Sequence, residues 1–253
     1  MDHVFQLPNG KSVTVNEFLY KDVKEFFYDK PLEAKADFLN TFIKTKNLNV
    51  LEKFIVLVKL RERCIKQSVT LNINGIDKDV DLEYILKAFN EILDIREEVQ
   101  IDNFKLVLDY PTEFVISTDN IFKIIQTIEI DNEIVDLNSV TPEEFTLITN
   151  SLPAQVLQTI TDFYNRKKKA LVVSAFENAD VEINFLNSSP FMFLDTLYRC
   201  IDPFTYREYL FVLSKRMRDV TFLANSTFID ILDYIELYKR ENEEEKEKVA
   251  KIK

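Results

Sequence analysis

Glycine is almost absent from this chain, which has only Gly10 and Gly75 among 253 residues. Glycine adopts the left-handed backbone of tight turns most readily, and a typical protein contains about 7% of it. Phosphate-binding loops and dinucleotide-binding turns need several glycines at fixed spacing. The sequence therefore excludes P-loop, Rossmann and kinase folds and favours helices without interruption.

Three consecutive helices are predicted across residues 189–242, a stretch rich in aromatic side chains. Apolar residues recur there with the spacing of one helix face. The three stripes are Leu194, Leu197, Tyr198 and Ile201; Tyr206, Tyr209, Leu210 and Leu213; and Phe228, Ile231, Leu232 and Ile235. Asp202 and Pro203 suit the N-cap and first turn of the middle helix. We expect these side chains to be mainly core, with part of the aromatic excess facing a protein partner.

Hairpins and further helices are predicted before residue 189. Residues 4–15 and 69–80 each alternate apolar side chains around an Asn-Gly pair, the strongest signal for a tight hairpin. A strand over residues 104–108 is expected beside the second hairpin. Helices are predicted at residues 16–29, 31–43, 49–67, 82–96 and 120–128, from the capping box at Thr141, and from Pro153 to the basic run at 166–169.

Together these patterns predict a mainly α protein with a small β element (α+β), in which a helical bundle carries an N-terminal hairpin and a short antiparallel sheet around residues 69–110. Residues 171–189 are irregular and rich in Asn, Asp and Ser, so they are the expected linker. The predicted regions are 1–116, helical with two hairpins and the small sheet; 117–188, helical; and 189–253, three aromatic helices with a charged helical tail.

The sequence has few of the histidine and cysteine side chains that catalytic and metal sites commonly use. The single histidine, His3, lies near the N-terminus, and the two cysteines, Cys64 and Cys200, lie far apart within helical apolar patterns. These residues cannot make a Cys/His zinc site or a reliable nucleophile–histidine pair. We predict no catalytic residue, no cofactor and no metal, with buried thiols in a reducing compartment. No signal peptide or membrane span is expected.

The chain is acidic, with a formal net charge of −11 that repels phosphate backbones. We therefore expect no nucleic-acid partner. A nucleic-acid-binding adaptor is an alternative that requires two basic groups to share one face. These groups are residues 166–169, which a helix C-terminus also explains, and Lys59, Arg61, Arg63 and Lys66.

Four short motifs follow one another in the first half of the chain. The first is Phe-Gln-Leu-Pro-Asn-Gly-Lys at 5–11, which leads into residues 16–22. The second is the leucine-arginine stretch at 56–61, followed by residues 68–71. The third is residues 81–85, and the fourth is residues 106–111, which end in Tyr110-Pro111. In this order they resemble the T-even-type phage baseplate hub protein family. Some relatives place a cysteine pair in the middle hairpin, where this chain has Asn72, Ile73, Asn74 and Gly75, so no metal role is transferred.

This resemblance implies a non-enzymatic protein of contractile-tail assembly, either a baseplate hub subunit or a hub assembly factor or chaperone. It implies binding to hub, tape-measure or tail-tube proteins, in the host cytoplasm during assembly and then in the virion if the protein stays there. Two other functions are open at this point. One is a carboxylate-dependent hydrolase of phage or bacterial origin, which needs a cleft with two close carboxyls of raised pKa. The other is a cytoplasmic helical adaptor.

Partner contact is predicted on the helix at residues 204–218, which combines the residue types enriched at interface hot spots. The predicted contact residues are Tyr206, Tyr209, Phe211, Arg216 and Arg218. Phe211 lies off the apolar stripe of this helix. Double substitution of Phe211 and Arg216 is therefore expected to weaken assembly without unfolding the protein.

Overall fold

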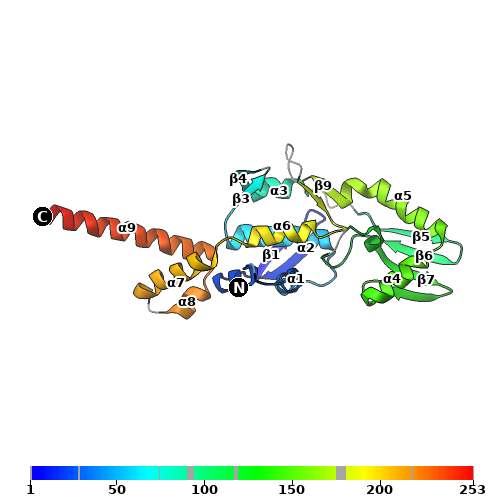
Figure 1. Cartoon of the computed structure of the whole chain (residues 1–253), viewed down its shortest axis with the longest axis horizontal. Helices are drawn as coiled ribbons and strands as arrows, with labels where there is room; N and C mark the ends of the chain where they lie inside the picture. Colours follow the sequence, from blue (N-terminus) through cyan, green and yellow to red (C-terminus); the bar gives the residue numbers. More distant parts are fainter. Residues whose placement is uncertain are drawn as a thin grey trace.

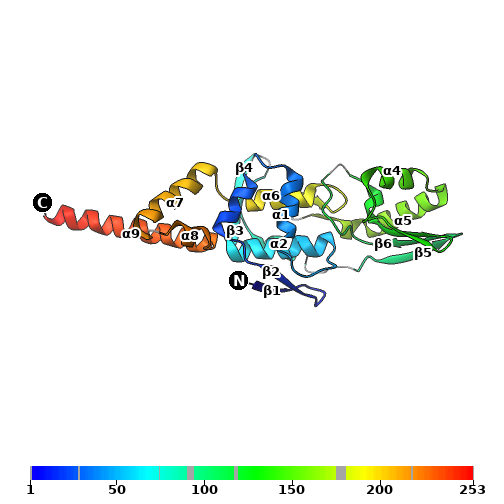
Figure 2. The same cartoon turned by 90° about the horizontal axis from the view of Figure 1, so that it is seen from below.

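The chain is seen in a computed structural model that describes residues 2–27, 29–73, 75–89, 94–116, 119–174, 181–217 and 219–252. The side chains of residues 73, 216–217 and 247–252 lie outside this description. The molecule is elongated. A four-stranded sheet lies at one end, packed helices form the centre, and a long helix projects at the other end (Figure 1, Figure 2).

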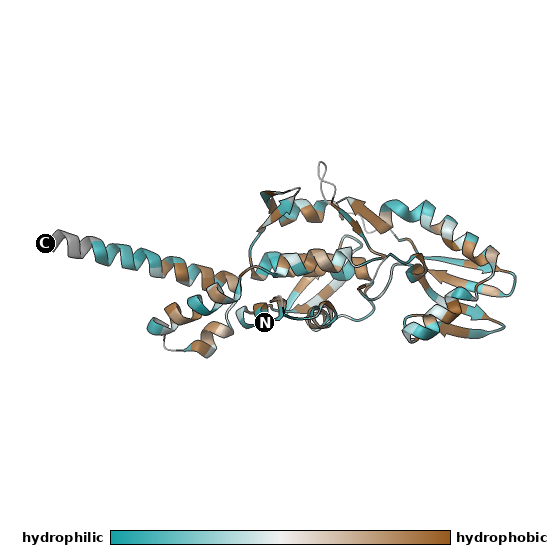
Figure 3. Ribbon diagram, viewed as in Figure 1, coloured by the Kyte–Doolittle hydropathy of each residue, from teal (hydrophilic) through white to brown (hydrophobic). Residues whose placement is uncertain are grey.

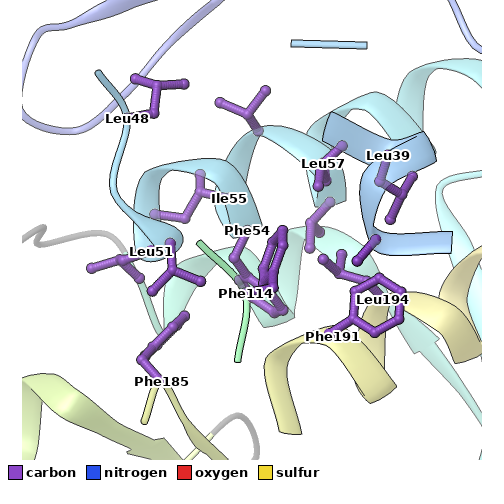
Figure 4. Packing of buried hydrophobic residues seen from close by; sticks show 14 of the residues in the cluster. Leu39, Leu48, Leu51, Phe54, Ile55, Leu57, Phe114, Phe185, Phe191 and Leu194 are labelled. Carbon is purple, nitrogen blue, oxygen red and sulfur yellow. The ribbon is translucent and has the colours of Figure 1, made fainter. Parts of the chain in front are cut away.

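The central core forms where α2 (Val50–Cys64) and α6 (Ser189–Tyr198) pack together, although they are far apart in the sequence. Their buried faces meet in one cluster of apolar side chains (Figure 4). The Tyr198 hydroxyl donates a hydrogen bond of 2.7 Å to the Leu57 carbonyl oxygen and so ties the two helices together. The predicted stripe is confirmed as core for Leu194, Leu197 and Tyr198.

The N-terminal hairpin is confirmed, and it pairs β1 (Asp2–Gln6) with β2 (Ser12–Asn16). Gly10 lies in its turn at φ +80°, a left-handed conformation that glycine adopts without strain. The helix predicted at 16–29 is shorter and tighter than expected. It is the 3-10 helix η1 (Tyr20–Phe26), and it is short because the residues that cap it at both ends are extended. Helix α1 (Leu32–Asn40) then begins after Pro31, as predicted.

The sheet at one end of the molecule is antiparallel, with strand order β5-β6-β7-β8. Its strands are β5 (Glu97–Ile101), β6 (Phe104–Leu108), β7 (Ile125–Ile130) and β8 (Glu133–Asp136). Strand β6 is confirmed as a strand, but its predicted place beside the second hairpin is wrong because β5 and β7 occupy its two edges. That hairpin, β3 (Ser68–Ile73) and β4 (Ile76–Asp81), forms its own two-stranded sheet.

The helix predicted at 120–128 is wrong. Only the short 3-10 helix η2 (Ile121–Ile124) forms there, and the chain continues as β7. Isoleucine and threonine fill six of the ten positions from 121 to 130, and β-branched side chains favour strands over helices. Asp131 and Asn132 both have positive φ, at 53° and 68°, and they turn the chain back into β8.

The helix predicted at 82–96 is also too long. Helix α3 (Leu82–Lys87) begins at the Asp81 cap, and by Glu97 the chain is in strand β5; residues 90–93 lie outside the described part. The capping box at Thr141 is confirmed at the start of α4 (Pro142–Asn150). Helix α5 (Ala154–Leu171) follows Pro153, as predicted, and continues through the basic run at 166–169, where it was expected to end.

The expected linker at 171–189 instead contributes to the fold. Strands β9 (Val172–Ser174) and β10 (Glu182–Asn184) pair antiparallel, while residues 175–180 lie outside the described part. Phe185 and Leu186, which follow β10, are completely buried. This segment therefore connects the sheet end of the molecule to the central core.

The C-terminal unit consists of α7 (Pro203–Met217), α8 (Val220–Ala224) and α9 (Phe228–Ile252). The sequence predicted three helices from residue 189 onward and did not predict α8. Asp219 caps this additional helix by accepting a hydrogen bond of 2.9 Å from the Phe222 backbone N–H. Helix α9 changes from hydrophobic to hydrophilic away from the body (Figure 3). At 25 residues it is about 37 Å long.

The predicted fold class is wrong. In the described part of the chain, four antiparallel sheets lie among the helices, so the protein is mixed α+β rather than a helical bundle with one short sheet. The difference arises at the segments around 97–101, 125–136 and 172–184, which form strands that the sequence did not predict. The division into regions 1–116, 117–188 and 189–253 stays a prediction.

Candidate interaction surface

The C-terminal unit is joined to the body through two tyrosines. The ring of Tyr20 in η1 is fully buried and stacks on Tyr206 of α7, with 4.7 Å between ring centroids and 14° between ring planes. The Tyr20 hydroxyl donates to the Tyr206 carbonyl oxygen at 3.2 Å. The Tyr20 backbone N–H donates to the Ser226 carbonyl oxygen at 2.8 Å. These contacts fix α7 and α8 against η1.

Burial has a clear electrostatic effect at this joint. It raises the pKa of Tyr20 far above that of a free tyrosine, and the neighbouring Tyr206 and Cys200 add to the shift. Burial also raises the pKa of Tyr206 itself. Both hydroxyls are therefore neutral over the physiological range, and the joint depends on ring packing and neutral hydrogen bonds.

The outer face of α7 carries two exposed phenylalanines. Phe204 is 76% exposed and Phe211 is 61% exposed. They are seven residues apart, which places them on the same side of the helix, two turns apart. The Lys215 ammonium lies 4.2 Å from the centroid of the Phe211 ring and covers one of its faces. We call Phe204 and Phe211 the α7 face.

The C-terminal unit carries further exposed apolar side chains. They are Val220 and Phe222 of α8 and Leu237 of α9, each about half exposed. Among the described residues, the only phenylalanines classed as exposed are Phe204, Phe211 and Phe222, and all three belong to this unit. Exposed aromatic side chains that gather in one place indicate a surface for protein contact.

The predicted contact residues separate into three groups. Tyr206 lies in the joint with η1, and Tyr209 lines a cavity between the body and the C-terminal unit. Phe211 faces outward. The side chain of Arg216 and the whole of Arg218 lie outside the described part. The prediction that these residues contact a partner stays open.

Phe204 was missed as a contact residue. Its signal was present in the sequence, because a phenylalanine seven residues before Phe211 must share its side of the helix. Phe222 was missed because α8 was not expected. Its exposure depends on the chain reversal between α7 and α9, which the periodicity of the sequence does not show.

The hydrolase alternative requires two neighbouring carboxyls of raised pKa in a cleft. Burial raises the pKa of three carboxyls, those of Asp22, Glu62 and Asp109. None of the three lines the cavity between the body and the C-terminal unit, whose one described carboxylate is Asp202. The pKa of Asp202 is lowered by hydrogen bonds from Thr205. These groups give the hydrolase alternative no support.

The two basic groups do not form one exposed face. Arg61 is buried, with 4% of its surface exposed, and Lys59 donates to the Gln6 carbonyl oxygen at 2.7 Å. Arg166 and Lys167 both contact the Glu97 carboxylate, at 3.0 Å and 3.1 Å. The Arg166 guanidinium holds the pKa of Glu97 below its usual value. Helices α2 and α5 also lie in different parts of the molecule (Figure 1).

No helix within the described ranges is long and apolar enough to span a membrane.

Comparison with known proteins gives one family. A family model described as T4 bacteriophage base plate protein matches residues 1–184, from β1 to the end of β10. Neither the curated proteins nor the solved structures contain a match. The resemblance to T-even-type baseplate proteins is thus confirmed for the family as a whole. The chain belongs to the T4 bacteriophage base plate protein family, and its role is in the phage tail.

Proposed function

We propose that this chain is a non-enzymatic baseplate hub subunit or hub assembly factor that binds hub, tape-measure or tail-tube proteins. The family gives the tail role. The observation that carries the proposal further is the α7 face, where Phe204 and Phe211 are 76% and 61% exposed on one side of a helix. Two exposed aromatic rings bury little area in the isolated fold, and they suit a protein partner.

The energy available from this face is sufficient for a specific contact. Full burial of a phenylalanine side chain contributes about 1.5–3 kcal/mol. The Tyr20–Tyr206 joint holds α7 in place before binding, so little orientational freedom of the helix is lost when a partner arrives. Lys215 covers one side of Phe211 in the free protein and can turn toward an acidic group on the partner.

The acidic charge of the chain supports a role in assembly. A formal net charge of −11 causes molecules to repel one another, so exposed phenylalanines need not lead to self-aggregation. The protein can then remain available in the host cytoplasm until the tail partner is present. Helix α9, with its hydrophilic outer half, adds to this charged surface (Figure 3).

Affinity capture from phage-infected cells tests the proposal. The tagged native chain is expected to recover at least one hub, tape-measure or tail-tube protein, identified by mass spectrometry. Recovery of no tail protein would show that the proposal is wrong. Mass spectrometry of purified virions then separates the two roles, because a hub subunit is present in the finished particle and an assembly factor is found only in the infected-cell lysate.

A further inference from the structure

A cavity of about 640 Å³ lies between the body and the C-terminal unit. The end of α2, strand β3 and the end of α6 form one side, and α7 with the start of α9 forms the other. Part of its wall is apolar, with side chains that include Ile65, Leu197, Phe228 and Leu232. The other part is basic, and its residues are Arg61, Lys66 and Arg199.

Arg61 is a buried cation on this wall. Its Nε donates to the Leu197 carbonyl oxygen at 3.2 Å, and its Nη1 donates to the carbonyl oxygens of Ser68, at 2.9 Å, and Lys66. All three acceptors are neutral, and no carboxylate of the described residues pairs with this guanidinium. Buried charges are normally paired, because removal of an ion from water is costly. Helix C-terminal carbonyls offset part of this cost, and a formal positive charge remains.

Arg199 adds further positive charge. The Asp195 carboxylate accepts from the Lys35 ammonium at 3.0 Å and also pairs with Arg199. Two cations therefore contact the Asp195 carboxylate, and one of them, Arg199, itself lines the cavity. Lys66 is exposed and contributes another at the opening.

Asp202 offsets only part of this charge, because the three cations Arg61, Lys66 and Arg199 line the same cavity. It is the one carboxylate among the described residues that line the cavity. Its Oδ1 accepts from the backbone N–H groups of Phe204 and Thr205, at 2.8 and 3.0 Å, where it caps the N-terminus of α7. The cavity is therefore positive in a chain whose formal net charge is −11.

We propose that this cavity binds a carboxylate-bearing segment of a partner protein. Arg61 and Arg199 receive an Asp, Glu or C-terminal carboxylate, because a guanidinium matches a carboxylate with two parallel donors. The apolar wall receives a neighbouring apolar side chain. This inference rests on the proposed function, which makes the occupant a protein. The positive charge and the apolar wall of the cavity indicate that the bound segment is acidic and partly apolar.

The position of the cavity connects it to the α7 face. Pro203 and Thr205 line the opening, and Phe204 between them is 76% exposed to solvent. A partner segment that leaves the cavity along the start of α7 therefore passes Phe204. The acidic anchor and the apolar surface can be used by one partner.

Fluorescence anisotropy with the purified full-length chain tests the cavity directly. The probe is a dye-labelled, capped hexapeptide of sequence Glu-Glu-Phe-Leu-Glu-Glu, and the matched peptide has glutamine in place of each glutamate. The acidic peptide is expected to bind about tenfold more tightly than the glutamine peptide, and added salt is expected to weaken it. Equal binding of the two peptides would overturn the proposal.

Two charge reversals localise the binding. Lys66→Glu is expected to weaken binding of the acidic peptide about fivefold, because one attractive surface charge becomes repulsive. Lys87→Glu is the control, since it changes net charge equally on α3, away from the cavity. Arg199→Gln is also expected to weaken binding, with circular dichroism confirming the fold. Equal effects of Lys66→Glu and Lys87→Glu would contradict a site at the cavity.

Sodium tripolyphosphate is the competing anion. Weak competition relative to unlabelled acidic peptide supports a protein segment, because the apolar wall contributes only to the peptide. Tighter binding of tripolyphosphate than of the peptide would overturn the proposal in favour of a small-anion site. These assays use no infected cells, so their failure is distinct from failure of the tail-protein capture that tests the proposed function.

Discussion

Tyr20 and Tyr206 stack with ring centroids 4.7 Å apart, although 186 residues separate them in the sequence. This pair joins the N-terminal part of the body to the helix that carries the exposed phenylalanines. The family match ends at residue 184, so one member of the pair lies within the matched region and the other beyond it. The C-terminal unit is therefore held by the family part of the chain.

Tyr206→Ala is expected to destabilise the protein by about 1–3 kcal/mol, because it removes a half-buried ring and its stacking on Tyr20. Tyr206→Phe is the matched control. It keeps the ring, and the hydrogen bond from Tyr20 is made to the backbone carbonyl, so stability should remain close to that of the native chain. Urea unfolding followed by circular dichroism measures both. Equal stability of the alanine variant and the native chain would show that the stack does not hold the unit.

The Asp195 carboxylate is expected to matter more for stability than Lys35, although they form one ion pair. Asp195→Asn leaves the Lys35 ammonium, which is 2% exposed, without its counter-ion, and should cost about 3–5 kcal/mol. Lys35→Met leaves Asp195 paired with Arg199 and should cost much less. The free energy of unfolding in urea compares the two variants. A larger loss for Lys35→Met would contradict this account of the charge cluster.

Stability is expected to fall in alkali as the pH rises above about 9. Burial raises the pKa of Cys64 from 9.0 to about 11, so the native state keeps the thiol protonated while the unfolded chain ionises. Between these two values the unfolded state binds fewer protons, and this group alone removes up to about 1.4 kcal/mol of stability for each pH unit. Unfolding measured from pH 8 to 11 follows this loss. Cys64→Ala should show a shallower decline, and an unchanged slope would contradict the assignment.

Both thiols should react slowly with a disulfide reagent in the folded protein at pH 8. Burial raises the pKa of Cys200 to about 12, and the neighbouring Arg61 lowers it only in part. The thiolate is the reactive form, so little of either residue is available. Titration with a chromogenic disulfide reagent should give two thiols per chain in urea and a much slower reaction without urea. Rapid native reaction of both thiols would contradict the raised pKa values.

Local signals in the sequence predicted those elements that depend on local chemistry. The turn at Gly10 and the cap at Thr141 were predicted correctly because a left-handed turn and a capping box are formed by neighbouring residues. The helix at 120–128 was wrong because isoleucines at helical spacing also suit a strand, and the pairing of β7 with β6 decided the outcome. Such pairing is a property of distant segments, which one sequence does not display.

The candidate surface was predicted only in part for the same reason. Phe211 lies off the apolar stripe of its own helix, so its outward position followed from periodicity. Tyr206 lies on that stripe, and its contact with Tyr20 depends on how α7 meets a segment near the N-terminus. The basic cavity depends on five separate elements, α2, β3, α6, α7 and α9. Its positive charge could not be found from the sequence because Arg61, Lys66 and Arg199 line one cavity only in the folded chain.

The most direct test of the account compares tail-protein capture by two variants in phage-infected cells. Phe204→Ser with Phe211→Ser removes the α7 face, whereas Leu147→Ser removes a side chain of α4 that is 70% exposed and lies away from it. Both variants should unfold at the same urea concentration as the native chain, because exposed side chains contribute little to stability. The double variant is expected to capture at least tenfold less tail protein than the native chain, whereas Leu147→Ser is expected to capture as much as the native chain. Full capture by the folded double variant would contradict binding through the α7 face.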